Sequence, residues 1–387
     1  MIVPGDYEAG YKRARQKDEA LADNYIRHTT IGDPVMDALV EELAPLPQDL
    51  IHQFINAGMQ EDKAGLRDAP EALREFFFTA PQPDPDWLDH DVFHPGIIAF
   101  QRNAADVLAA FVAGTLLVGF STLISKSFVQ TGRIFDNGVW RLRQNNRHML
   151  EIFFPGGLER QGDGWKLSLR IRFIHAQVRR LLAQSEEWEH EAWGVPVSAA
   201  HMGFAVANFA VSTLDFSTKL GAFYTPEERA GFFAVWRYSG YVMGVPESIL
   251  FSDENSATHL RDIGLLCEPP PTDESILMSN ALINSAPLVA GIEDPRQRHA
   301  MVTKLIYPVS RALIGATLAD QLRFPKNTMP LTLFLYRLDR RIKTLKAMFS
   351  RQNESTFASL LMVSAYDDSG LSYRLPDNVR AEDSRQW

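Results

Sequence analysis

The strongest constraint on the fold is the run from Val107 to Ser125, which contains no charged side chain over 19 residues. A helix of this length comes close to spanning a bilayer, and in a soluble protein it has to be buried by other elements. Gly114, Thr115 and Gly119 dilute its hydrophobicity, and no basic cluster marks either end of it. We therefore expect a central helix packed inside a helical protein, with a membrane span as the alternative.

The remaining chain shows helix signals and no sustained alternation of apolar and polar residues. Thr225-Pro226-Glu227-Glu228 combines an N-cap, a proline at the first helical position and an acidic first turn. A break at Gly32-Asp33-Pro34 precedes a further helix, which runs to Leu43. With 387 residues, 45% of them hydrophobic, and no evident linker, the chain is predicted to form a single large all-α domain.

Composition excludes several kinds of site and partner. The formal net charge is −9 and the basic residues do not gather in a tail, so no nucleic-acid-binding surface is expected. A single cysteine, Cys267, excludes an internal disulfide and any cysteine-based zinc or iron–sulfur site. Motifs for dinucleotides, phosphate loops and serine hydrolases are missing. The first residues lack the apolar core of a signal peptide, so we expect a cytoplasmic location.

The stretch from Thr131 to Arg180 holds the candidate site. It is predicted to form a helix, a Pro-Gly-Gly turn, a short charged loop and a second helix that carries His175. This histidine lies on a mostly apolar helix face flanked by arginines. Such a residue is either a core histidine that bonds a backbone carbonyl or a single axial ligand to a haem iron whose propionates pair with arginines.

A second candidate metal site lies in the proline-rich segment from Thr79 to Pro95, which is expected to be a loop. Two imidazoles and a carboxylate, the ligand set of a non-haem iron centre, are available there from Asp86, Asp89, His90, Asp91 and His94. Their spacing is not diagnostic, and solvated loop residues are the alternative interpretation.

Several motifs occur in a fixed order over about residues 20 to 325: T-G-R, a basic helix, P-G-G-L, G-W, R-x-R-x-x-H-A-x-V-R, W-G-x-P-V and L-G-A-F-Y-T-P-E-E. This order resembles the family of rubber oxygenases (latex clearing proteins) and MpaB-type oxygenases. The resemblance implies an all-α domain with a globin-like core that encloses a haem b pocket, in which His175 is the proximal ligand of the iron. Arg172 and Arg179 are then candidates for pairing with the haem propionates or for buttressing the helix.

On the distal side, the resemblance implies a catalytic role for Arg141. Gln144 and Asn145 stand where the family has a lysine or acid and then a threonine. Arg141 would stabilise negative charge that builds up on dioxygen, and the two amides would donate hydrogen bonds to the same oxygen.

The implied activity is oxidative cleavage of a carbon–carbon double bond in a small hydrophobic, isoprenoid-like substrate, with dioxygen as co-substrate. The departures at Gln144 and Asn145 leave two alternatives open. One is a haem-binding sensor or store without turnover, and the other is a haem-free helical protein that retains the fold.

We expect residues 1–20 to be an N-terminal extension, residues 21–350 the helical haem domain, and residues 366–387 a disordered tail. A basic amphipathic helix is predicted from about Pro330 to Phe349, with cationic residues at Arg337, Arg340, Arg341, Lys343 and Lys346. It is typical of a solvated face, and peripheral contact with an anionic membrane is the alternative. The sequence does not predict the oligomeric state.

Overall fold

The computed structural model describes residues 1–79, 81–131, 146–289, 292–326, 331–338, 375–376 and 378–379. Within these ranges the regular elements are helices, with no strand, so the all-α prediction is confirmed. The α-helices are α1 (Glu8–Arg15), α2 (Glu19–His28), α3 (Pro34–Leu43), α4 (Gln48–Met59), α5 (Glu71–Arg74), α6 (Phe93–Ala110), α7 (Leu116–Phe120), α8 (Ile124–Gln130), α10 (Asp163–Ala183), α11 (His190–Trp193), α12 (Ala199–Leu220), α13 (Pro226–Val242), α14 (Glu254–Cys267), α15 (Asp273–Val289), α16 (Pro295–Met301), α17 (Tyr307–Ile314) and α18 (Ala316–Gln321).

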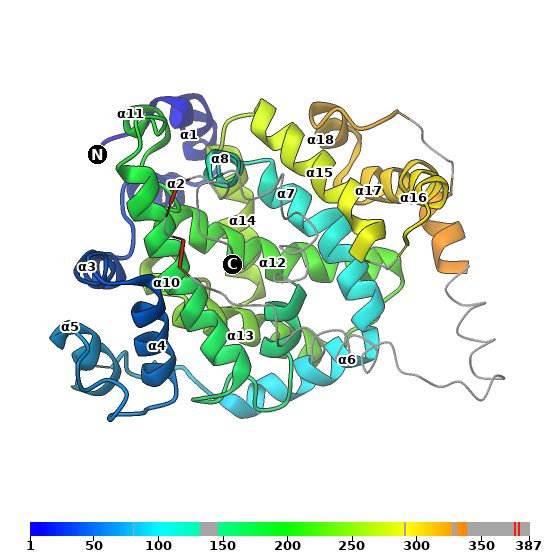
Figure 1. Cartoon of the computed structure of the whole chain (residues 1–387). Coiled ribbons are helices and arrows are strands. Elements are labelled where there is room, and N and C mark those ends of the chain that lie inside the picture. The colour runs from blue at the N-terminus through cyan, green and yellow to red at the C-terminus, as the bar shows by residue number, and fades with distance from the viewer. Residues whose placement is uncertain are drawn as a thin grey trace.

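Short helical turns complete the list. Three are 3-10 turns, η1 (Gly5–Tyr7), η3 (His90–Val92) and η5 (Glu247–Ile249), and three are π-helical turns, η2 (Glu75–Thr79), η4 (Phe111–Thr115) and η6 (Val302–Ile306). Residues 146–152 are also helical. Figure 1 shows α12 in the middle of the molecule, with α6, α10 and α13 around it.

The predicted central helix is one continuous helical run, His90–Phe120, built from η3, α6, η4 and α7. It is long and apolar enough to cross a membrane by length and composition, and 67% of its most apolar window is buried inside the protein. It packs against α12 and α13, which is what a core helix does. The run ends at Phe120, before Ser125, because the hydroxyls of Ser121 and Thr122 donate to the carbonyls of Val118 and Gly119.

Side-chain caps fix where the long helices begin. Asp33 accepts from the backbone N–H of Met36 and places Pro34 at the start of α3. Ser198 caps α12, and Thr225 and Glu228 form a capping box at the start of α13, as its sequence predicts. These caps orient the helices that line the candidate site.

Residues 1–20 contribute directly to the core, although the sequence suggested an extension. Tyr7 and Ala14 are fully buried, and α1 packs against α14. The boundary at residue 20 therefore does not separate two packing units in the described part of the chain.

An aromatic stack fills the space between α6, α13 and the segment after residue 152. The ring centroids of Phe100 and Phe153 are 4.5 Å apart, and those of Phe153 and Phe232 are 4.6 Å apart. All three side chains are fully buried. Stacked and tilted aromatic pairs at these distances add specific attraction to the burial of apolar area, so this stack ties α6 and α13 together.

Part of the predicted basic helix falls within the described residues, where residues 332–338 are helical. Its apolar side chains Leu331, Phe334 and Leu335 are exposed, and Arg337 donates to the backbone carbonyl of Lys219. Arg340, Arg341, Lys343 and Lys346 lie outside the described residues, as does most of the predicted tail. Peripheral membrane contact stays a prediction.

Gly96 and Gly231 allow α6 and α13 to approach closely. A Cβ on Gly96 would come within 2.3 Å of the backbone nitrogen of Phe232, whereas a Cβ on Gly119 would have its nearest neighbour 3.7 Å away. We predict that Gly96→Ala lowers the free energy of unfolding by roughly 1–3 kcal/mol, because backbone must move. The matched variant Gly119→Ala should gain up to about 1 kcal/mol from helix propensity. Urea unfolding measures the free energy of unfolding of both variants. Equal changes in the two variants would contradict the close contact between Gly96 and the backbone of α13.

Candidate functional site

His175 lies in the middle of α10 on the same helix face as Arg172 and Arg179, three residues before and four residues after it. These three side chains line a cavity of about 250 Å³. The rest of its wall comes from the loop before α3, from the start of α12 and from the end of α13: Gly32, Asp33, Val197, Ala199, Met202, Met243 and Gly244. The predicted helix face is thus assembled into a cavity lined by both charged and apolar residues.

The imidazole of His175 is held in its neutral form. Burial, together with smaller contributions from the positive charge of Arg179 and from nearby His148, lowers the pKa of His175 to about 3. Its Nδ1 atom is buried without a hydrogen-bond partner among the described residues. A neutral imidazole with an unused nitrogen is the form that binds a metal ion.

Arg172 is fixed by acceptors on two other segments. Its Nε and Nη2 atoms donate to the two carboxylate oxygens of Asp33 at 2.5 and 3.0 Å, and its Nη1 atom donates to the side-chain oxygen of Gln82. Both side chains of the ion pair are nearly buried, with 7% and 10% exposed. A bidentate pair in this setting holds the guanidinium in one orientation.

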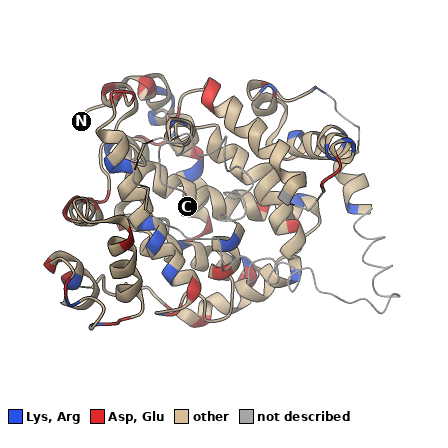
Figure 2. Cartoon of the chain, viewed as in Figure 1, with Lys and Arg blue, Asp and Glu red and all other residues tan. Residues whose placement is uncertain are grey.

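Arg179 makes a second ion pair, with Asp37 on α3, the helix that Asp33 caps. Its Nη2 atom lies 2.7 Å from Oδ1 of Asp37, and its Nη1 atom donates to the carbonyl of Val197 at 2.6 Å. Figure 2 shows acidic residues of α3 near basic residues of α10. The two pairs buttress α10, one of the two roles expected for Arg172 and Arg179, and pairing with propionates stays a prediction.

Two glycines leave room for these pairs. A Cβ on Gly244 would lie 2.3 Å from Oδ2 of Asp33 and 2.4 Å from Nε of Arg172, and Gly244 also has a φ of +82°. A Cβ on Gly32 would meet Asp37 and Arg179 at similar distances. Side chains at either position would displace an ion pair.

His148 is a site residue that the sequence reasoning missed. It is buried on residues 146–152, and its Nε2 atom lies 2.9 Å from the hydroxyl of Ser168 on α10 and 3.4 Å from that of Ser239 on α13. Ser168 is two helical turns before His175, on the same face. A clue was present in the sequence, because His148 is close to Arg141 in the stretch that was predicted to hold the site, but nothing local indicates its serine partners.

The distal candidates Arg141, Gln144 and Asn145 lie outside the described residues. The described chain resumes at Asn146, and His148 is already packed against α10. The roles of these three residues stay predictions.

The alternative metal site in the proline-rich segment is not assembled. Among the described residues, no group of three or more His, Cys, Asp or Glu side chains is arranged to hold a metal ion. The ring of His90 instead packs against Phe93 and Tyr238, and Asp89 caps the short turn that starts at His90. The predicted loop also ends early, because α6 begins at Phe93.

Comparison with known proteins gives a family and a fold. The family model described as "ER-bound oxygenase mpaB/B'/Rubber oxygenase, catalytic domain" matches residues 101–343. A solved structure described as latex clearing protein LCP in the closed state is similar, with a TM-score of 0.67 and 19% identity, over 81% of this chain and 84% of that one. A search of curated proteins finds no match. At this identity the structural likeness concerns the fold alone.

The ion pair between Arg172 and Asp33 generates a stability prediction. Arg172→Met leaves a nearly buried carboxylate without its partner, so we expect the free energy of unfolding to fall by roughly 3–5 kcal/mol. The control Arg180→Met removes the partner of Glu41, whose side chain is 58% exposed, and should cost less than about 1 kcal/mol. Urea unfolding at pH 7 measures both losses. Equal losses would show that the buried pair does not hold α10.

The buried histidines predict how stability depends on pH. Burial lowers the pKa of His148 to about 4, below its ordinary value of 6.5. In the unfolded chain, His148 binds a proton below about pH 6.5, whereas in the folded protein it does so only below about pH 4. The contribution of neutral, buried His148 to the free energy of unfolding is therefore fully present above pH 6.5 and decreases as the pH falls toward 4. His148→Gln should reduce the slope between pH 6 and 4.5 by about 1.4 kcal/mol per pH unit in metal-free protein. Urea unfolding across this range measures the slope, with pH 8 as the control, and an unchanged slope would contradict the buried neutral histidine.

Proposed function

Because the chain belongs to the family of the mpaB/B' and rubber oxygenase catalytic domain, we propose that it is a haem b-dependent oxygenase that uses dioxygen to cleave a carbon–carbon double bond in a hydrophobic, isoprenoid-like substrate. Membership in a family of oxygenases supports the reaction class. The haem, the double-bond cleavage and the substrate are the parts that we propose.

The observation that carries the proposal is the state of His175. An axial haem ligand has to be neutral and has to offer a free nitrogen, and His175 is neutral with Nδ1 unpaired among the described residues. The cavity offers one histidine, and the carboxylate of Asp33 in its wall is already paired with Arg172. Among the described residues no group of three or more His, Cys, Asp or Glu side chains could hold a metal ion, so a single histidine fits a haem better than a metal ion held by side chains alone. The chemistry of His175 therefore fits the role of an axial haem ligand.

The size of the cavity limits how much of a haem these residues alone could enclose. Its volume of about 250 Å³ is below the roughly 300–1,000 Å³ of pockets that enclose small organic ligands. A macrocycle would need space beyond the part that these residues line. Val197, Ala199, Met202 and Met243 would give its faces apolar contacts and exclude water.

When bound, haem b supplies the iron that activates dioxygen. The protein's own residues supply position and charge. The ion pairs of Arg172 and Arg179 fix the rotation of α10, so that His175 keeps its orientation toward the cavity. Arg141 is proposed to stabilise negative charge on oxygen in the transition state, and Gln144 and Asn145 to donate hydrogen bonds to the same oxygen.

The reaction balances without a further reductant, because one dioxygen molecule and one double bond give two carbonyl groups. A cytoplasmic location stays part of the proposal. A haem-binding protein without turnover and a haem-free protein are the two alternatives that the following experiment separates.

The test is the reaction of haem-loaded protein with an isoprenoid alkene and ¹⁸O₂, followed by mass spectrometry of the products. We predict one labelled oxygen atom on each new carbonyl group. Arg141→Ala should lower the rate about 100-fold, equivalent to roughly 3 kcal/mol, because a charge-stabilising donor is lost. Arg143→Ala, two residues along the same segment, is the matched control and should keep the wild-type rate.

Label that comes from water would contradict the proposed chemistry. An Arg141→Ala variant as fast as wild type would contradict the role of Arg141. Haem-loaded protein that gives no product would favour the sensor or store, and protein that takes up no haem would favour the haem-free alternative.

A further inference from the structure

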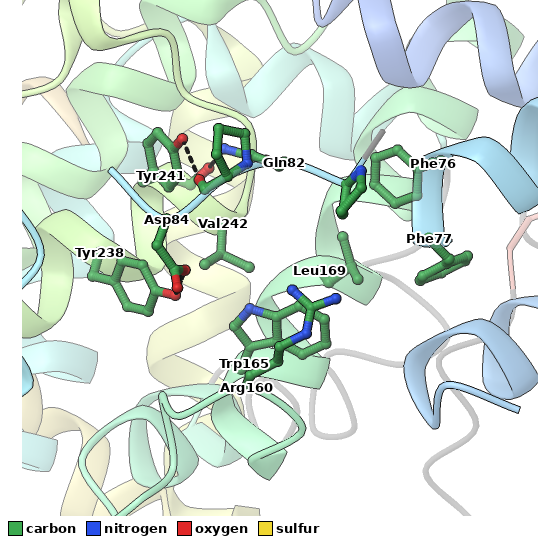
Figure 3. Close-up of a pocket in the computed structure, with 12 residues that line it drawn as sticks. Phe76, Phe77, Gln82, Asp84, Arg160, Trp165, Leu169, Tyr238, Tyr241 and Val242 are labelled. Atoms are coloured by element: carbon green, nitrogen blue, oxygen red, sulfur yellow. Dashed lines mark hydrogen bonds between the residues drawn. The ribbon is translucent and has the colours of Figure 1, made fainter. Parts of the chain in front are cut away.

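A second, larger pocket lies beside the His175 cavity and has no assigned role. It is bounded by η2, the segment 81–84, the start of α10 and the end of α13, and the space between them is about 460 Å³ with the open solvent at its mouth included. Figure 3 shows Phe76 and Phe77 on one side, Tyr238, Tyr241 and Val242 on the other, and Leu169 and Trp165 between them.

The pocket has an apolar floor and a polar mouth. Phe77, Leu169, Tyr238 and Val242 are buried, whereas Asp84 and Arg160 are exposed. Arg160 is already paired with Glu61 at 2.7 Å, and its guanidinium lies 5.6 Å from the ring of Trp165. Its charge is therefore compensated before any ligand binds.

The polar groups of the segment 81–84 are used to hold that segment in place. Gln82 donates to the carbonyl of Tyr241 at 3.1 Å, and the Tyr241 hydroxyl donates to the carbonyl of Pro83 at 2.8 Å. The side-chain oxygen of Gln82 accepts from Arg172. Since these donors and acceptors are occupied, the interior favours a ligand without polar groups of its own.

One carboxylate oxygen remains available at the mouth. The Tyr238 hydroxyl donates to Oδ1 of Asp84 at 3.2 Å, while Oδ2 makes no hydrogen bond to the described residues. A ligand with an apolar chain and a hydroxyl at one end would place the chain on the aromatic floor and donate from the hydroxyl to Oδ2 of Asp84.

The pocket and the His175 cavity share walls. Trp165 and Leu169 in the pocket are followed along the same face of α10 by Arg172 and His175 in the cavity. On α13, Tyr241 and Val242 face the pocket, and Met243 and Gly244, directly after the helix, line the cavity. The hydrogen bond between Gln82 and Arg172 joins the wall of the pocket to the wall of the cavity.

We infer that this pocket binds the substrate: it takes an unsaturated hydrocarbon chain with a terminal hydroxyl group, next to the cavity of His175. That the ligand is a substrate rests on the proposed function. The binding itself is a property of the pocket and can be measured without turnover.

The test measures the affinity of farnesol for haem-loaded protein under anaerobic conditions, by isothermal titration calorimetry. Phe76→Ala removes an aromatic wall that contacts Phe77 and Phe173, and should weaken binding roughly tenfold. The matched control is Phe78→Ala, because Phe78 is a neighbouring half-buried phenylalanine that does not line the pocket. It should change the affinity less than about twofold.

A second arm tests the polar mouth. Wild type should bind farnesol more tightly than the hydrocarbon farnesene, and Asp84→Ala should remove that difference by weakening farnesol alone, about fivefold. If farnesol and farnesene bind wild type equally, or if Phe76→Ala and Phe78→Ala behave alike, the inference is wrong.

Photoaffinity labelling of wild type locates the ligand without any substitution. A farnesyl diazirine should label the peptides that contain Trp165 or Tyr241, in competition with farnesol, and labelling only elsewhere would overturn the inference. Specific binding without any oxygenated product would contradict the proposed function and leave the pocket assignment standing. Cleavage of an alkene with the same KM in wild type and Phe76→Ala would support the function and reject the pocket as its substrate site.

Discussion

The two ion pairs between α3 and α10 are the interactions on which the candidate site depends. Arg172 pairs with Asp33, and Arg179 pairs with Asp37, across 139 and 142 residues of sequence. Removing charges from water is costly, so such pairs are retained only where geometry is good and further hydrogen bonds satisfy the remaining groups. Gln82 and the carbonyl of Val197 supply those bonds. The rotation of α10, and with it the direction of His175, is therefore fixed by residues far away in the chain.

The fixed rotation of α10 also explains how this helix lines both the aromatic pocket and the His175 cavity. Along α10, Trp165 and Leu169 face the aromatic pocket, and Arg172, His175 and Arg179 face the cavity. Arg172 belongs to both, because it lines the cavity and bonds Gln82 of the neighbouring pocket. The positive charge of Arg179, added to burial, keeps the pKa of His175 low. Electrostatics and packing thus act together to keep the imidazole of His175 neutral beside the aromatic pocket.

The sequence predicted the features of the fold that depend on interactions between neighbouring residues. The caps of α12 and α13, the break before α3 and the helix that carries His175 could be predicted because capping and helix periodicity depend on residues a few positions apart. The partners of Arg172 and Arg179, the serines beside His148 and the pocket under residues 81–84 depend on contacts over many tens of residues, which no local pattern encodes. The burial of Tyr7 in the core was missed for the same reason.

The central claim is that His175 binds haem through a neutral imidazole held by α10, and its most direct test is a haem titration followed by absorption spectroscopy. Wild type should bind one haem b per chain and show a Soret band with a histidine-ligated ferrous spectrum. His175→Ala, checked for helical content by circular dichroism, should bind haem at least about 100-fold more weakly, in line with the loss of a coordinate bond. Wild type that binds no haem, or a His175→Ala variant with full affinity and an unchanged ferrous spectrum, would contradict the account.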